Sequence, residues 1–140
     1  MSNPEWMPCI FELENPNGKV ISSPWTIANI DDTDVVLTYN VPLPMIKDGK
    51  RLQLSSIRVG IQEASPTDRV KEIHARGCMF NKCVVFGENK QGFASSQRVQ
   101  IDFPVHDCSG FDAVKIIVYL ECTKQYGVDI GFVSVQYQYI

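Results

Sequence analysis

Cysteines and histidines are the first residues whose types and spacing point to chemistry. Cys78 and Cys83 form a C-x4-C pair, and His106 and Cys108 form an H-x-C pair. Zinc takes four nitrogen or sulfur ligands in a tetrahedron, so these four residues make a candidate set. The spacing departs from the common C-x2-C pattern, the number of cysteines is odd, and buried cysteine behaves as a small apolar residue. We therefore expect no metal and all five cysteines reduced.

Two further clusters carry reactive or ligating side chains. The segment "HDCSG" (106–110) sets a His, an Asp, a Cys and a Ser close together, but no strand–turn–helix elbow surrounds it. The segment "DDTD" (Asp31, Asp32 and Asp34) lacks the Gly and the terminal Glu of a calcium-binding loop, which favours an exposed acidic turn. Glycine-rich phosphate loops are absent as well. We expect a protein that is not an enzyme and that holds no cofactor.

Basic residues are unevenly placed along the chain. Residues 47–98 hold ten of the 13 Lys and Arg but five of the 16 acids, so this segment is +5 while the remainder is −8. Such asymmetry predicts a basic face for an anionic partner, and the alternative is a set of solvated charges. The predicted phosphate contacts lie in a turn and around a short helix: Lys47, Lys50, Arg51, Arg69, Lys71 and Arg76. Aromatic residues interleave with bases in "ARGCMFNKCVVF" (75–86), which is typical either of a single-strand stacking surface or of ordinary core residues.

The elements that must position these residues are mostly strands. Apolar residues alternate with polar ones over 35–41, 52–61, 98–105 and 133–139, and one face of 114–122 is wholly apolar. The alternation over 52–61 changes phase at Ser55-Ser56, as a β-bulge would cause. Pro66 in a first turn and Gly77 at an end predict one short helix over 65–77. The pattern predicts an all-β antiparallel sandwich of jelly-roll type, with about seven or eight strands and at most one short helix.

Length and composition favour one domain over residues 1–140, with a full hydrophobic core. No apolar run is long enough for a membrane span, and the first residues lack the pattern of a signal peptide. We expect a cytoplasmic protein that is not secreted.

The segment 98–140 resembles the corresponding part of the thirty-kilodalton superfamily of plant-virus movement proteins. An apolar strand leads to Phe103-Pro104, a long apolar strand follows over 113–122, and Tyr126-Gly127 precedes the strand "GFVSVQYQY". That superfamily is similar to single jelly-roll viral capsid proteins. The resemblance implies a viral protein in the host-cell cytoplasm that binds single-stranded nucleic acid and associates with itself as a homo-oligomer. Two alternatives stay open: a capsid or virion-surface protein that assembles into a shell, and a β-sandwich recognition module for carbohydrate or protein.

Overall fold

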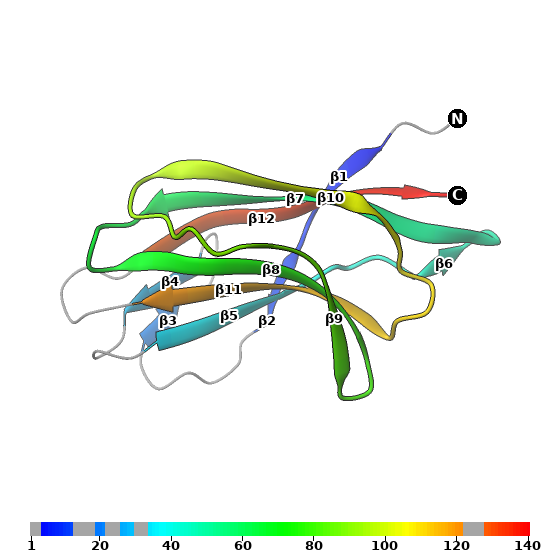
Figure 1. Ribbon diagram of the computed structural model, residues 1–140, viewed down its shortest axis with the longest axis horizontal. Helices are drawn as coiled ribbons and strands as arrows, with labels where there is room; N and C mark the ends of the chain where they lie inside the picture. The colour runs from blue at the N-terminus through cyan, green and yellow to red at the C-terminus, as the bar shows by residue number, and fades with distance from the viewer. Residues whose placement is uncertain (1–3, 13–18, 22–25, 30–33, 122–127) are drawn as a thin grey trace.

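The polypeptide forms strands in two antiparallel sheets that pack face to face (Figure 1). This computed structural model describes residues 4–12, 19–21, 26–29, 34–121 and 128–140. The described residues contain no helix, which confirms the all-β expectation. In chain order the strands are Glu5–Pro8 (β1), Ile10–Glu12 (β2), Lys19–Ile21 (β3), Thr26–Asn29 (β4), Asp34–Asn40 (β5), Ile46–Lys47 (β6), Lys50–Glu63 (β7), Arg69–Met79 (β8), Lys82–Asn89 (β9), Gln97–Asp107 (β10), Ala113–Glu121 (β11) and Val128–Tyr139 (β12).

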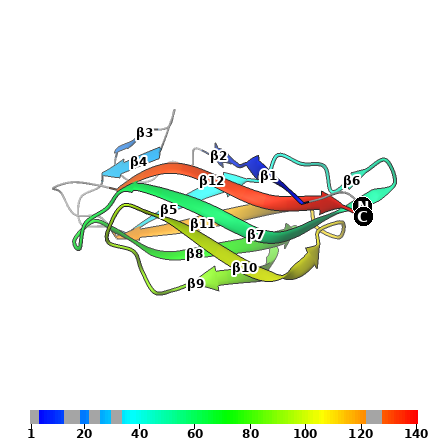
Figure 2. The same ribbon diagram turned by 90° about the horizontal axis from the view of Figure 1, so that it is seen from above.

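The two sheets differ in size and in their edges. The larger sheet has the order β10-β7-β12-β4-β3, with β1 paired to β12 and β6 paired to β7. The smaller sheet has the order β2-β5-β11-β8-β9. In Figure 1 the long strands of the larger sheet lie above those of the smaller sheet, and in Figure 2, seen from above, the two layers overlap. β12 therefore lies inside the larger sheet, between β7 on one side and β1 and β4 on the other.

The core lies between the sheets and follows the alternation of the sequence. Val114, Ile116, Val118 and Leu120 of β11 are all buried, as the apolar face of this strand predicts. Cys122, the next position on that face, lies outside the described residues. Residues of β5, β7, β8, β10 and β12 complete one continuous apolar cluster. A fully buried aliphatic side chain contributes about 1.5–3 kcal/mol, so this interlayer cluster is the main source of stability.

The predicted bulge in β7 is confirmed. Opposite β12, Gln136 pairs with Ser56 and Tyr137 pairs with Leu54, which leaves Ser55 as the extra residue. Leu52 and Leu54 before the bulge and Ile57 after it consequently all point into the core. Ser56 is also buried, and its hydroxyl donates to the carbonyl oxygen of Ile101 at 3.1 Å.

The predicted helix over 65–77 is wrong, because Arg69–Met79 is the strand β8. Its pairing with β11 shifts register between Tyr119, opposite Glu72, and Leu120, opposite Val70. Lys71 is therefore an extra residue, and the bulge places the buried residues Val70 and Ile73 three positions apart. Spacing of three is also the helical spacing, so a bulged strand here has the sequence pattern of a helix.

The expectation of five reduced cysteines is also wrong. Cys78 lies directly opposite Cys83 in the β8–β9 hairpin, and the two form a disulfide. Four residues between two cysteines place them face to face when those four residues form the end of a hairpin. Cys9 and Cys108 carry free thiols, and burial raises the pKa of each to about 12.

Candidate functional site

The six predicted phosphate contacts do not lie together: three lie at one end of the long strand β7, two lie beyond its other end, and Arg76 lies further along β8. Lys47, Lys50 and Arg51 lie at the β6–β7 turn, at the right-hand end of Figure 1. Arg69 and Lys71 lie beyond the other end of β7, at the start of β8, whereas Arg76 lies near the far end of β8. β7 has 14 residues, and at about 3.3 Å per residue its ends are roughly 43 Å apart. The structure therefore does not bring all six residues together in one place.

All three arginines among the predicted contacts already have partners. Arg51 lies 2.9 Å from a carboxylate oxygen of Asp107, and Arg69 lies 3.1 Å from one of Glu121. Arg76 donates to the hydroxyl of Tyr119 at 2.7 Å. Lys71 lines a hollow of about 250 Å³ near Arg69, together with Glu72, Lys90, Gln91, Gly92 and Tyr119. Its lining carries three cations and one carboxylate. Two of the cations are paired with carboxylates outside the lining, Arg69 with Glu121 and Lys90 with Glu88, so the hollow presents no simple basic surface.

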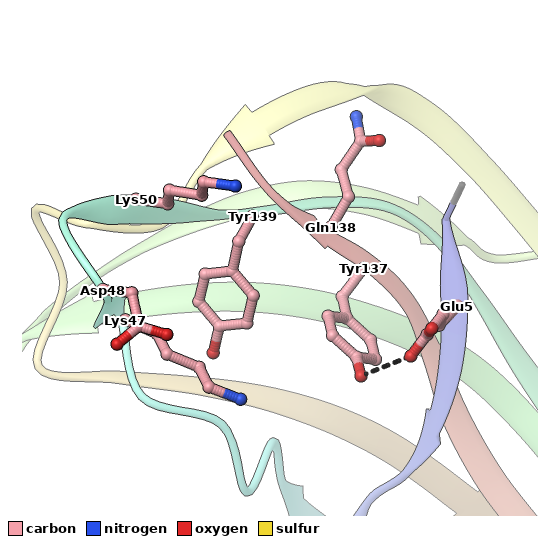
Figure 3. Close-up of a pocket in the computed structure, with 7 residues that line it drawn as sticks. All are labelled: Glu5, Lys47, Asp48, Lys50, Tyr137, Gln138 and Tyr139. Atoms are coloured by element: carbon pink, nitrogen blue, oxygen red, sulfur yellow. Dashed lines mark hydrogen bonds between the residues drawn. The ribbon is translucent and has the colours of Figure 1, made fainter. Parts of the chain in front are cut away.

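The β6–β7 turn borders a second hollow, which we call the lysine–tyrosine hollow. It has a volume of about 270 Å³ and is lined by Glu5, Lys47, Asp48, Lys50, Tyr137, Gln138 and Tyr139. Figure 3 shows the two tyrosine rings side by side and pointing the same way, while Gln138 points away from them. The ring centroids lie 6.0 Å apart in an edge-to-face arrangement, and Nζ of Lys47 lies 5.9 Å from the Tyr139 centroid. Residues some ninety positions apart in the sequence thus meet in one place.

Strand pairing and a tight turn place these side chains. Asp48 and Gly49 have φ of 52° and 74°, and two positive φ values are the signature of a type I′ hairpin turn. The turn holds Lys47 and Lys50 opposite each other as cross-strand partners. On the other side, Tyr139 pairs with Leu52 of β7, and backbone hydrogen bonds between Ile140 and Arg51 continue the ladder. The lysines and tyrosines are therefore fixed by backbone rather than by flexible loops.

Hydrogen bonds hold both tyrosine rings in position. The Tyr137 hydroxyl donates to Glu5 at 3.0 Å, and the Tyr139 hydroxyl donates to the carbonyl oxygen of Pro44 at 2.7 Å. The bond to Glu5 raises the pKa of Tyr137, and burial raises the pKa of Tyr139. Both rings stay neutral at ordinary pH and present apolar surface. With two ammonium groups and two carboxylates, Glu5 and Asp48, the hollow has a formal charge of zero.

The tyrosines were absent from the predicted site, because the alternating pattern assigned them to the core. Tyr137 and Tyr139 do share a face with Val133 and Val135, but only the two valines are buried. One feature of the sequence could have indicated their exposure: both tyrosines lie at the end of the alternating segment 133–139. Which turn they meet there depends on the pairing of β12 with β7, and one strand's pattern does not specify its partner.

The candidate zinc set is not assembled. Two of its four members are joined as the Cys78–Cys83 disulfide, and the His106 ring stacks on Phe86 with centroids 4.1 Å apart. Within the described ranges, no group of three or more His, Cys, Asp or Glu side chains is placed to hold a metal ion. Asp31 and Asp32 of the candidate acidic turn lie outside those ranges, and Asp34 opens β5.

The "HDCSG" segment lies at the end of β10 and in the residues that follow it. Asp107 accepts a hydrogen bond from the amide of Ser109 at 2.9 Å, which lowers the pKa of its carboxyl group. Cys108 is fully buried, and desolvation keeps its thiol protonated near neutral pH. A protonated thiol is a poor nucleophile.

A second polar cluster lies on the outer face of the smaller sheet. His74 is buried, and its Nδ1 accepts from Arg76 at 2.9 Å because a guanidinium group only donates. The pKa of His74 is lowered from its ordinary 6.5, mainly by burial and secondly by the charge of Arg76. Nε2 therefore carries the proton of the neutral ring, and it faces Glu72 at 3.5 Å and Glu88 at 3.8 Å. These contacts explain Arg76 as part of the sheet's own polar network.

Comparison with known proteins adds no relative: no family model, curated protein or solved structure matches the chain. Across the part of the chain that is described, no helix has the length and apolarity needed to cross a bilayer.

Proposed function

We propose that this is a non-enzymatic jelly-roll protein that binds single-stranded nucleic acid at the lysine–tyrosine hollow. The observation that carries the proposal is the position of Lys47 beside the Tyr139 ring, in a hollow that Tyr137 and Lys50 also line. Proteins that hold single strands without sequence preference combine cations along the backbone with aromatic rings on which bases stack. The binding surface is thus smaller than the basic face that the sequence predicted, and it includes two aromatic residues.

The order of strand pairing supports the jelly-roll topology. From β4 onward, and leaving out the two-residue β6, first pairs with last (β4 with β12), then β5 with β11, β7 with β10, and β8 with β9. All four pairings are antiparallel. A long antiparallel ribbon paired in this nested order and rolled into two layers is the jelly-roll arrangement of two Greek keys. A relative of the movement proteins and of the jelly-roll capsid proteins would have this topology. We therefore extend the proposal to a viral, self-associating protein of that kind.

The charges of the hollow set the expected strength of binding. Two lysines neutralise about two phosphates, so the log–log salt slope for a single strand should be about −1.4. Base stacking on an aromatic ring contributes about 1–3 kcal/mol per base. Stacking on two tyrosines should therefore account for more of the affinity than the phosphate contacts do.

The test is titration of a labelled single-stranded RNA at a series of salt concentrations. Lys47→Gln with Lys50→Gln should flatten the salt slope, and Tyr139→Leu should weaken binding roughly tenfold while leaving the slope unchanged. Lys82→Gln is the matched control, because Lys82 is an exposed lysine at another hairpin. If the unmodified protein does not bind RNA or DNA at low salt, the proposal is wrong.

The zero formal charge of the hollow favours one alternative, a carbohydrate site. Its carboxylates, lysines and tyrosine rings offer acceptors, donors and apolar faces to a neutral sugar. Binding of a glycan would be nearly independent of salt, whereas nucleic-acid binding would not. A glycan screen run at two salt concentrations, with Tyr139→Leu as the negative control, distinguishes the two functions.

A further inference from the structure

The β8–β9 hairpin ends in an exposed apolar tip, residues 78–85. Phe80 is 94% exposed, and Met79, Val84 and Val85 are 48%, 50% and 43% exposed. In Figure 1 the turn between β8 and β9 extends away from the rest of the ribbon, at the bottom of the view. Burial of Phe86, the next aromatic residue, shows that this sequence can place a phenylalanine in the core. Phe80 instead lies at the outermost point of the hairpin.

The backbone of the tip is held in an unusual conformation. Phe80 has a φ of 55°, and a bulky residue in the left-handed region is a genuine outlier at a turn position that glycine usually fills. Its amide donates to the carboxylate of Asp112 at 3.0 Å. The Cys78–Cys83 disulfide closes the base of the tip. A cross-link and a hydrogen bond thus hold an aromatic ring in solvent, and such strain is concentrated at functional sites.

We infer that this tip inserts into an anionic lipid surface. Stable protein–protein interfaces use roughly 20–30 residues a side, far more than the segment 78–85 supplies. A membrane surface requires only a few apolar side chains below the headgroups and a cation beside them. Lys82 is the only charged residue of the tip, and a lysine at this place favours anionic headgroups.

The arrangement of side chains fits shallow insertion. Phe80 and Met79 stand at the turn, Val84 and Val85 flank it, and the aliphatic part of Lys82 can lie along them while its ammonium group stays at headgroup level. Pairing between β8 and β9 continues to Met79 opposite Lys82, next to the turn. β9 is an edge strand, and its outer backbone groups stay in water when only the turn is inserted. Only the turn itself must leave water, which keeps the cost of insertion small.

Vesicle sedimentation with the full chain tests the inference. Vesicles of phosphatidylcholine containing phosphatidylserine should bind the protein, and vesicles of phosphatidylcholine alone should bind it more weakly. Phe80→Asn should lower partitioning roughly ten- to hundredfold, and asparagine tolerates the left-handed conformation, so the fold is kept. Lys82→Gln should lower binding to the anionic vesicles about fivefold and should leave binding to neutral vesicles unchanged.

Two matched variants control for loss of any apolar or basic surface residue. Ile10→Asn removes an exposed apolar side chain of β2, and Arg98→Gln removes an exposed cation of β10; neither should change partitioning. The inference is overturned if the unmodified protein does not sediment with vesicles at low salt. It is also overturned if the Phe80→Asn variant binds vesicles as well as the unmodified protein. Self-association that depends on Phe80 without vesicles would equally overturn it, by assigning the tip to a protein partner. None of these outcomes bears on RNA binding at the lysine–tyrosine hollow.

Discussion

Two hairpin turns of this protein both require positive φ, but they use residues with opposite preferences for that conformation. The β6–β7 turn uses Asp48 and Gly49, both with positive φ, and lysines flank it. The β8–β9 turn has Phe80 at positive φ, valines nearby and a disulfide at its base. The first turn has the residues that its backbone favours, whereas the second has a residue that its backbone disfavours.

This difference distinguishes residues that favour the fold of a turn from residues that serve a function of the turn. Aspartate and glycine at the β6–β7 turn need no explanation beyond the hairpin, and the candidate chemistry comes from the neighbouring lysines and tyrosines. At the β8–β9 turn, neither the conformation nor the exposure of Phe80 helps the fold. A local preference that is violated with no structural gain is the better indicator of function.

Both hairpins belong to sheets that share one core. The largest effect on stability should come from a substitution in that core. Val118 in β11 is fully buried, so Val118→Asp places an unpaired carboxylate among apolar side chains. The cost is several kcal/mol, comparable with the whole stability of a domain. Circular dichroism should show an unfolded or insoluble protein. Val36→Asp is the control, because Val36 is 40% exposed on β5 and should tolerate the change; a folded Val118→Asp protein would contradict the core assignment.

Only one of the two hairpins is cross-linked, and removing the cross-link should affect that hairpin alone. The cysteines are five positions apart, and closing so short a loop stabilises by about 2 kcal/mol in the chain-entropy account. Replacing Cys78 and Cys83 together by Ala should lower the unfolding free energy by about that amount in urea titrations. Hydrogen exchange should quicken at the amides of the β8–β9 turn and stay unchanged at the β6–β7 turn. Equal protection of the β8–β9 turn in both proteins would contradict a bracing role for the disulfide.

Much of the fold could be predicted, because the alternation of apolar and polar residues along a strand indicates directly which side chains are buried. Apolar residues at every second position marked β7, including its bulge, and the inner face of β11. The turn at Asp48-Gly49 was also evident, since that residue pair favours a hairpin. Patterns of this kind are local, and a single sequence contains them.

The errors arose where pairing or a bulge decides the outcome. The bulge at Lys71 gives β8 the spacing of a helix, and the Cys78–Cys83 disulfide follows only once β8 and β9 are known to pair. The basic residues are close in sequence, yet the length of β7 separates Lys47, Lys50 and Arg51 from Arg69 and Lys71. Tyr137 and Tyr139 join the lysines only through the register of β12 on β7. None of these relations is local, so residue types alone could not specify them.

The smallest and sharpest prediction compares the two turns directly. Gly49 has φ of 74°, and a Cβ there would meet nothing within 4 Å, so Gly49→Ala tests backbone strain alone. It should destabilise the protein by about 1 kcal/mol, because a side chain disfavours the left-handed region. Phe80→Gly should do the reverse and leave the stability unchanged or raise it by up to about 1 kcal/mol, since relief of strain exceeds the entropy that glycine adds to the unfolded chain. Urea titrations of both variants beside the unmodified protein measure the two signs. A clear loss of stability in Phe80→Gly would mean that the Phe80 ring packs usefully in the folded protein, and the contrast between a turn built for folding and a turn built for contact would no longer hold.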